Sequence, residues 1–332
     1  MDVPVALSPP FADLPVLVER PGSQTTPLVF TSPHSGSDYP ASFVAASRLD
    51  RMGLRRSEDS FVDELFGAAA LYGAPMVRAM FPRAWCDVNR EPWELDPAMF
   101  ADALPSWVNT TSARVTSGLG TIARVVASGE TIYRDKITFA DAEQRVALCW
   151  QPFHDMVAAL VQGTKAVFGQ CVLIDCHSMP SFGSVTPGLG TPGLGAPGVG
   201  ADRVGVPRLG APRPGALRPG APARGRGERS VDIILGDVHG TSCAPYITRF
   251  VERRLIDLGY RVRRNDPYAG GYITRHYGRP RERVHALQIE IARDLYMDES
   301  RFERLDRFDE IRADISALIE SLASRAMSLE TD

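Results

Sequence analysis

The chain has 332 residues, of which 44% are hydrophobic and 23% charged, a composition typical of a globular protein with a sizeable core. The formal net charge of -3 and the pI near 6.1 exclude a general attraction to nucleic acid or to anionic membrane surfaces. No stretch of the sequence approaches the ~20 apolar residues of a membrane span. We therefore expect a soluble protein that binds neither nucleic acid nor membrane.

The cysteines and the first residues bear on where the protein works. The five cysteines form no CxxC pair, and their odd number argues against a disulfide framework. The first 21 residues lack the basic stretch and the continuous apolar run of a secretory signal. Both features predict a cytoplasmic protein, because thiols stay reduced there.

The first predicted strand covers residues 28–31 and runs into SPHSGSDYP, a loop at 32–40 that is rich in turn formers. His34 therefore comes just after a strand. Taken by itself, a histidine in such a loop is more simply explained by capping a turn than by binding a ligand.

Residues 57–72 carry apolar side chains at helical spacing, so we predict one helix with Ser57 as its N-cap. Glu58 and Asp59 then lie in the first turn, where carboxylates interact favourably with the helix dipole. That capping role is the simpler interpretation of both acids. The alternative is that one of them binds a metal ion at the start of the helix.

Residues 75–80 predict another strand, and the segment that follows places Asp87, Asn89 and Arg90 among apolar neighbours. A buried arginine needs partners. Either Asp87 pairs with Arg90 as a structural brace, or Arg90 faces a pocket and binds an anionic substrate through its planar fork. Residues 94–138 follow no clear pattern and could form a flap over an active site.

Residues 141–168 predict an amphipathic helix, which Pro152 should kink or split. Its apolar face consists of Val146, Ala147, Trp150, Phe153, Val157 and Leu160. Residues 172–174 then predict a short buried strand that ends in Asp175, Cys176, His177 and Ser178. Open α/β sheets bind ligands at the carboxyl ends of their central strands. A core histidine at a strand end explains His177 equally simply.

Residues 184–230 form a loose Pro/Gly repeat without the strict period of collagen. Such a segment has little apolar surface to offset the entropy lost on ordering, so we predict a disordered insertion. We expect a single domain over residues 1–332 that this insertion interrupts.

The last third predicts a strand at 231–235, a helix at 245–258, an edge strand at 261–264 and a terminal amphipathic helix within 300–329. Residues 285–291 alternate, so Ala286, Gln288 and Glu290 face one way and three aliphatic residues the other. A glutamate between two isoleucines is either salt-bridged or a catalytic carboxylate with a tuned pKa.

Three histidines (34, 177 and 239) follow strand-like segments and have acids nearby. A zinc hydrolase needs two or three His or carboxylate ligands with one position open for water, and a Glu as base. An Arg or the metal then polarises the acyl oxygen. No HExxH motif occurs. The residue types favour a metallohydrolase without identifying its substrate.

Seven segments resemble the N-formylglutamate amidohydrolase family, in the same order, over about residues 28–299. They are SPHSGSDYP, EDSFVDELF, DVNREPWELD, DCHSMPS, DIILGDVHGTSCAP, GGYITRHYGRP and HALQIEIARDLYMDE. The family is related to zinc carboxypeptidases and aspartoacylases. The resemblance therefore implies an α/β fold, a three-layer sandwich around a central mixed sheet like that of the zinc carboxypeptidases.

The resemblance also implies a metal site. His34 and His177 resemble the two histidine ligands of one zinc ion per chain. Asp59 is our choice for the carboxylate ligand, because it matches the acid that precedes the helix in the family; Glu58 and Asp38 are the alternatives.

Roles in catalysis and substrate binding follow from the same resemblance. Glu290 resembles the general base and acid. Asn89 and Arg90 resemble the Asn-Arg pair that binds the substrate carboxylate in carboxypeptidases, and Arg275 is expected to add a second cationic contact. Asp237 and His239 either support the site at its rim or are purely structural.

The implied activity is zinc-dependent hydrolysis of N-formyl-L-glutamate or a related small N-acyl amino acid. With N-formyl-L-glutamate the products are formate and glutamate, which would place the enzyme in histidine degradation. One alternative is a peptidase or cell-wall amidase of the same wider group. Another is a binding protein that keeps the pocket without turnover, against which the retained Glu290 argues.

Overall fold

The computed structural model describes residues 11, 14–181 and 231–325, so the insertion predicted at 184–230 lies outside the described residues. The main sheet consists of β1 (Val16–Glu19), β2 (Leu28–Ser32), β3 (Met76–Ala79), β4 (Cys171–Met179), β5 (Ile233–Gly236), β6 (Val262–Arg264) and β7 (Val284–Ala292). Their order across the sheet is β1-β3-β2-β4-β7-β5-β6. A two-stranded ribbon joins β8 (Met297–Asp298) and β9 (Glu303–Arg304).

The sheet is mixed. Strands β3, β2, β4 and β7 are parallel to one another. At the two sides, β1 runs antiparallel to β3 and β5 runs antiparallel to β7, while β6 is parallel to β5. The carboxyl ends of four central strands therefore lie along one edge of the sheet, where α/β proteins place ligands.

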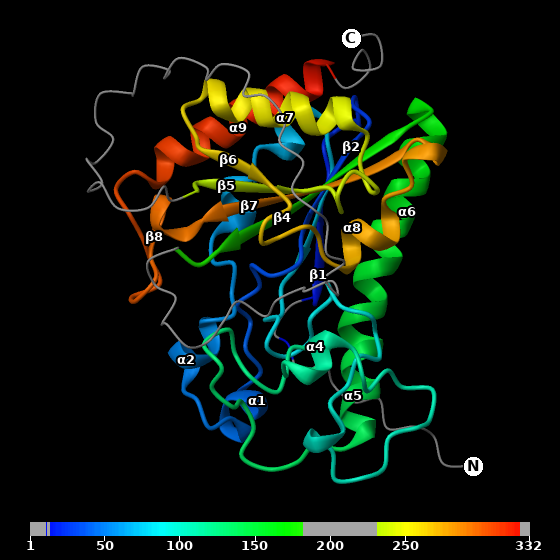
Figure 1. Cartoon of the computed structure of the whole chain (residues 1–332), viewed down its shortest axis with the longest axis vertical. Helices are drawn as coiled ribbons and strands as arrows, with labels where there is room; N and C mark the ends of the chain where they lie inside the picture. The colour runs from blue at the N-terminus through cyan, green and yellow to red at the C-terminus, as the bar shows by residue number, and fades with distance from the viewer. Residues whose placement is uncertain (1–10, 12–13, 182–230, 326–332) are drawn as a thin grey trace, which may run out of the picture.

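Helices cover both faces of this sheet (Figure 1). The α-helices are α1 (Ala41–Ala46), α2 (Arg51–Arg55), α3 (Val62–Leu65), α4 (Ala113–Thr116), α5 (Phe139–Arg145), α6 (Gln151–Phe168), α7 (Pro245–Asp257), α8 (Tyr272–Tyr277) and α9 (Phe308–Arg325). Short 3-10 turns are η1 (Ala69–Tyr72), η2 (Pro97–Met99), η4 (Pro280–Glu282) and η5 (Arg293–Leu295).

Strict alternation along the strands divides the core in two. On β7, Leu287, Ile289 and Ile291 belong to a core that includes apolar residues of α3, α7 and α9. Ala286 belongs to the opposite core, which includes apolar residues of α1, α6 and α8. The predicted alternation of residues 285–291 is confirmed. Its polar members, Gln288 and Glu290, face the same side as Ala286.

The helix predicted over 141–168 is confirmed and begins slightly earlier. A π-helical turn, η3 (Val146–Trp150), joins α5 to α6 just before Pro152. Proline has no N–H to donate to the preceding turn, so the interruption falls where the sequence predicts it. Ala147, expected on the apolar face, is exposed instead.

The continuous helix predicted over 57–72 is wrong. Only α3 and η1 are helical there, and the residue before α3, Phe61, has a φ of 67°, which breaks the helical path. Ser57 caps no helix; its hydroxyl accepts a hydrogen bond from the Ala127 backbone N–H at 3.1 Å. The apolar residues of this segment pack against the core, which explains their helical spacing. Because Phe61 is left-handed, Glu58 and Asp59 precede the helix and do not lie in its first turn.

Strand β4 is longer than the three residues predicted for it. It extends to Met179, and all nine of its residues are buried. Asp175 and His177 thus lie within the strand and not after it, because pairing with β7 continues as far as Met179. Strand β1 was missed altogether, because five prolines are spread through residues 1–26 and Pro15 directly precedes the strand.

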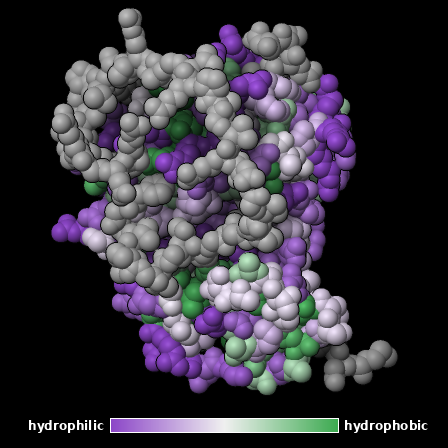
Figure 2. Space-filling view, viewed as in Figure 1, coloured by the Kyte–Doolittle hydropathy of each residue, from purple (hydrophilic) through white to green (hydrophobic). Residues whose placement is uncertain are grey.

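The remaining predicted elements are confirmed: β2, β3, β5, β7, α7, α9 and the edge strand β6. All five cysteines are buried and free. In the described part of the chain no helix is long and apolar enough to cross a membrane. On the face shown in Figure 2, hydrophilic residues surround small hydrophobic patches at the end that carries α4 and α5.

Candidate metal centre and active site

Three buried side chains meet at the carboxyl edge of the parallel strands. His34 follows β2, Asp59 precedes α3, and His177 lies near the end of β4. One ligand atom from each lies within 4.8 Å of the others. Asp59 Oδ2 is 3.0 Å from His177 Nδ1 and 3.4 Å from His34 Nδ1. The two Nδ1 atoms therefore converge on one carboxylate oxygen.

Asp59, rather than its neighbours, reaches this cluster. Its backbone N–H donates to the His34 carbonyl at 3.0 Å, which ties the two loops together. Glu58 instead accepts hydrogen bonds from Tyr39, Arg55 and Ser60. Neither Glu58 nor Asp38 belongs to the His34–Asp59–His177 group.

Two further carboxylates orient the histidines. His34 Nε2 lies 2.7 Å from Asp87 Oδ1, and His177 Nε2 lies 2.9 Å from Asp175 Oδ2. A carboxylate only accepts, so each Nε2 carries a proton, and a metal ion at the cluster would take the place of any proton on Nδ1. Metal-binding histidines characteristically donate their second ring nitrogen in this way.

The electrostatics of His34, Asp59 and His177 favour a cation among them. His34 Nδ1 is buried and has no hydrogen-bond partner within residues 14–181 and 231–325. Burial opposes ionisation of Asp59, but the hydrogen bond from His177 and the nearby His34 ring outweigh burial and hold the pKa of Asp59 well below its usual value. Burial alone would lower the pKa of His177, yet Asp175 and Asp59 hold it well above its usual value. The three side chains thus favour positive charge between them, which a metal ion would supply.

Arg293, in η5, holds the other oxygen of Asp59. Its Nη2 donates to Asp59 Oδ1 at 3.1 Å, and its Nε donates to Ser178 Oγ at 3.1 Å. Because Oδ1 accepts this hydrogen bond from Arg293, Oδ2 is the oxygen left to face the two histidines.

Glu290 lies beside the cluster on β7, directly across from His177 in the β4–β7 register. It is 7% exposed, and among the described residues it forms no ion pair, so the salt-bridge interpretation does not hold there. Gln288 Nε2 donates to its Oε1 at 2.7 Å. Burial raises the pKa of Glu290 to about 7, although the nearby His177 opposes that rise.

The Asn-Arg pair is more embedded than its predicted role suggests. The Asn89 carboxamide accepts from the Ile273 N–H at 2.8 Å, and its Nδ2 donates to Asp175 and lies 3.2 Å from His177 Nε2. Arg90 is buried and donates to the carbonyls of Leu119 and Asn89.

Asp87 has a closer cationic partner than Arg90. The Arg90 Nη2 lies 3.8 Å from Asp87 Oδ2, while Arg83 donates to the same oxygen at 2.7 Å. Both interpretations of Arg90 thus remain compatible with its position, and Arg83 is the main brace of Asp87.

Arg275 and His239 lie outside the buried cluster. Arg275 is exposed on α8 and makes no ion pair within the described residues. His239 is exposed in the loop after β5. Asp237 is buried and accepts hydrogen bonds from Asn265 and Thr248, which fits the structural interpretation of that residue.

Sequence reasoning missed the residues that support the cluster. Asp175, Arg83, Gln288 and Arg293 were not assigned to the site, and Asp87 was considered only as a brace for Arg90. Their nearness in sequence to Glu290 could have indicated two of them: Gln288 and Arg293 lie two and three residues from Glu290 in the segment HALQIEIARDLYMDE.

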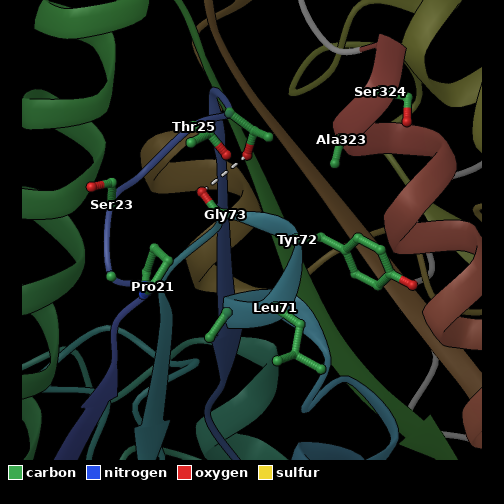
Figure 3. Close-up of a pocket in the computed structure, with 11 residues that line it drawn as sticks. Pro21, Ser23, Thr25, Leu71, Tyr72, Gly73, Ala323 and Ser324 are labelled. Carbon is green, nitrogen blue, oxygen red and sulfur yellow. Dashed lines mark hydrogen bonds between the residues drawn. The ribbon is translucent and has the colours of Figure 1, made fainter.

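A separate hollow of about 560 Å³ lies at the opposite edge of the sheet, beside the amino ends of β2 and β3 (Figure 3). Uncharged residues line it, among them Thr25, Leu71, Tyr72 and Ser324. None of its lining residues belongs to the metal-binding cluster.

Comparison with known proteins connects this arrangement to one family. The sequence model of a family described as N-formylglutamate amidohydrolase matches residues 26–210 and 214–297. A relative from Pseudomonas aeruginosa named N-formylglutamate deformylase is 28% identical over 302 residues, covering 89% of this chain and 92% of that protein. A second, from Pseudomonas putida and of the same name, is 24% identical over 277 residues, covering 82% and 83%.

Solved structures agree. The crystal structure of N-formylglutamate amidohydrolase from Ralstonia eutropha superposes with a TM-score of 0.76 at 31% identity, covering 94% of this chain and 98% of that one. A protein from Agrobacterium tumefaciens superposes with a TM-score of 0.58 over 96% of this chain at 17% identity, a likeness in fold alone.

Proposed function

The chain belongs to the N-formylglutamate amidohydrolase family, and from that premise we propose that it hydrolyses N-formyl-L-glutamate or a closely related small N-acyl amino acid. Membership makes it a hydrolase of a carbon–nitrogen bond other than a peptide bond. The proposed products are a carboxylic acid and the free amino acid. If the substrate is N-formyl-L-glutamate, these are formate and glutamate, which would place the reaction in histidine degradation.

One observation carries the proposal: two histidine Nδ1 atoms and one carboxylate oxygen converge in a buried site, and His34 Nδ1 has no hydrogen-bond partner among the described residues. His34, Asp59 and His177 would hold a single metal ion. Zinc is our choice because imidazole nitrogens and a carboxylate oxygen are its usual ligands, and three protein ligands leave one position open. When bound, zinc would activate water and polarise the acyl oxygen.

Glu290 would act as the general base and acid. Its carboxylate would accept a proton as water attacks the acyl carbon, and would then donate that proton to the departing amine. Its position opposite His177 and its lack of an ion pair among the described residues support this role. A dication at the cluster would lower the pKa of Glu290, because it favours the ionised form.

The substrate contacts stay predictions of the sequence. Arg90 and Arg275 would supply the positive charge for the substrate carboxylates, with Asn89 beside Arg90. Arg83, which is partly exposed and pairs with Asp87, adds a third candidate cation on the same side as Arg90. Guanidinium groups suit carboxylates because their planar fork matches two oxygens.

The proposal extends to the architecture. We assign the chain to one domain with the three-layer sandwich of the zinc carboxypeptidases. Helices against both faces of a mixed sheet support the layering.

The experiment that tests the proposal is elemental analysis of the purified protein, with formate release from N-formyl-L-glutamate measured on the same sample. We expect about one zinc per chain and turnover of N-formyl-L-glutamate. His177→Ala should lose the metal and the activity together, while His239→Ala, which removes an exposed histidine outside the cluster, should keep its zinc.

Two results would overturn separate parts of the proposal. Absence of bound metal from the wild type, even after zinc is supplied, would refute the metal site. A zinc-loaded protein that hydrolyses another N-acyl amino acid but not N-formyl-L-glutamate would refute the substrate and leave the chemistry standing.

A further inference from the structure

Gln288 connects Glu290 to the first turn of α8. It lies two residues before Glu290 on β7, so both side chains are on the same face. Its Nε2 donates to Glu290 Oε1 at 2.7 Å, and its Oε1 accepts from the Gly271 backbone N–H at 3.0 Å. The side chain is 4% exposed, so both ends of a buried carboxamide have protein partners.

The orientation of this carboxamide follows from its partners. A backbone N–H can only donate, so the oxygen of Gln288 must face Gly271. The nitrogen then faces Glu290. The reverse orientation would set a carbonyl oxygen against a carboxylate and an NH₂ group against an N–H, leaving both contacts repulsive and buried.

Gly271 is itself held in place from the other side. A Cβ at this position would lie 2.3–2.5 Å from the atoms of the Asn89 carboxamide, so only glycine lets the chain approach so closely. Asn89 in turn accepts from the Ile273 N–H at 2.8 Å and contacts His177 Nε2 at 3.2 Å. The turn that anchors Gln288 is therefore fixed relative to the histidine of the metal cluster.

We propose that Gln288 is a positioning residue for the reaction, which holds Glu290 Oε1 so that Oε2 is the oxygen presented to water. The proposal rests on the proposed role of Glu290 as base. Among the described residues no other hydrogen bond reaches the Glu290 carboxylate. Without Gln288 the carboxylate could rotate about its last bond, and misplacement of a reacting group by about 1 Å can cost about 100-fold in rate.

The test is Gln288→Met, which keeps the length of the side chain and removes both its donor and its acceptor. We expect kcat to fall roughly 10- to 100-fold while KM changes by less than about 3-fold and zinc content stays the same. Amide hydrogen exchange at Gly271 should be faster than in the wild type, because that N–H loses its acceptor. This measurement needs neither substrate nor metal.

Gln24→Met is the matched control. Gln24 Nε2 donates to the Thr26 carbonyl at 3.0 Å and to Thr164 Oγ1 at 2.9 Å, at the opposite edge of the sheet. This variant removes a partly buried donor, so it should lose some stability but keep kcat within about 2-fold. It separates a positioning effect from general destabilisation.

A double variant separates positioning from structure. In a Glu290→Gln background, Gln288→Met should lower the residual rate by less than about 2-fold, since the group that it positions is already disabled. Full additivity of the two losses would overturn the proposal, and so would an unchanged kcat or an unchanged exchange rate at Gly271. If the wild type hydrolyses no N-acyl amino acid, the proposed function fails first and the positioning role fails with it.

Discussion

The two edges of the central sheet differ in the chemistry of their side chains. At the amino edge of β2 and β3, Thr26 Oγ1 donates to the Gly73 carbonyl, and uncharged residues line an open hollow (Figure 3). At the carboxyl edge, His34 Nδ1 is buried beside Asp59 and a second histidine, without a hydrogen-bond partner in the described part of the chain. The unsatisfied histidine nitrogen beside carboxylates, rather than open volume, is the reason for proposing the carboxyl edge as the site.

The largest effect that this contrast predicts is at Glu290. Glu290→Gln keeps the shape of the side chain and removes its ability to accept and return a proton. We expect kcat to fall about 10³-fold with KM and zinc content nearly unchanged, since general acid–base catalysis contributes about 10² to 10⁴. Steady-state kinetics and elemental analysis test this, and full activity in the variant would rule out Glu290 as the base.

Arg293→Met tests whether the orientation of Asp59 at the carboxyl edge matters for metal binding. The variant loses the donors to Asp59 Oδ1 and Ser178 Oγ, so the carboxylate can rotate away from the histidines. Metal affinity should weaken about 10- to 100-fold, the usual effect of losing such support. Competition with a chromophoric chelator measures it.

Arg261→Met is the control for that experiment. Arg261 also pairs with an aspartate, Asp232, at 2.6 Å, but the pair lies outside the metal cluster. Zinc affinity should be unaffected. Equal weakening in the two variants would mean that the effect arises from lost stability rather than from the orientation of Asp59.

The free energy of unfolding should depend on pH through His154. His154 is buried between the Val88 carbonyl and the Tyr277 hydroxyl, and burial lowers its pKa to about 4. In the unfolded chain His154 takes up a proton near pH 6.5, but in the folded chain it does so only near pH 4. The folded state therefore loses stability relative to the unfolded state as the pH falls from about 6.5 toward 4. The loss attributable to His154 should reach about 2 kcal/mol by pH 5.

Urea unfolding at pH 7 and pH 5 measures this loss. His154→Gln removes the titrating group, so its free energy of unfolding should fall less between the two pH values than that of the wild type. A fall of the same size in both proteins would assign the acid sensitivity to other residues.

The smallest effect is expected at the opposite edge. Leu71 is 85% exposed and lines the hollow of Figure 3. Leu71→Ser should leave kcat/KM unchanged and alter the free energy of unfolding by less than about 0.5 kcal/mol, as is usual for exposed sites. A large loss of turnover in this variant would show that the amino edge also contributes to activity.

Patterns within short segments of the sequence were sufficient to predict several candidate site residues and the family. Alternation over residues 285–291 placed Glu290 on the polar side of its strand, and the positions just after 28–31 and 172–174 singled out His34 and His177. The family resemblance of the seven segments is confirmed by the comparisons. These features depend on neighbours a few residues away, so a single sequence contains them.

Relations between distant segments came only from the tertiary structure. Asp59 was an open choice until the left-handed Phe61 and the hydrogen bond to His34 placed it in the cluster. The contacts of Arg293 with Asp59 and of Gln288 with Gly271 depend on the β4–β7 register and on the approach of Gly271 to Asn89. Periodicity tells which face a residue occupies, but not which strand lies beside it, and the long-range pairing that decides this is a property of the whole fold.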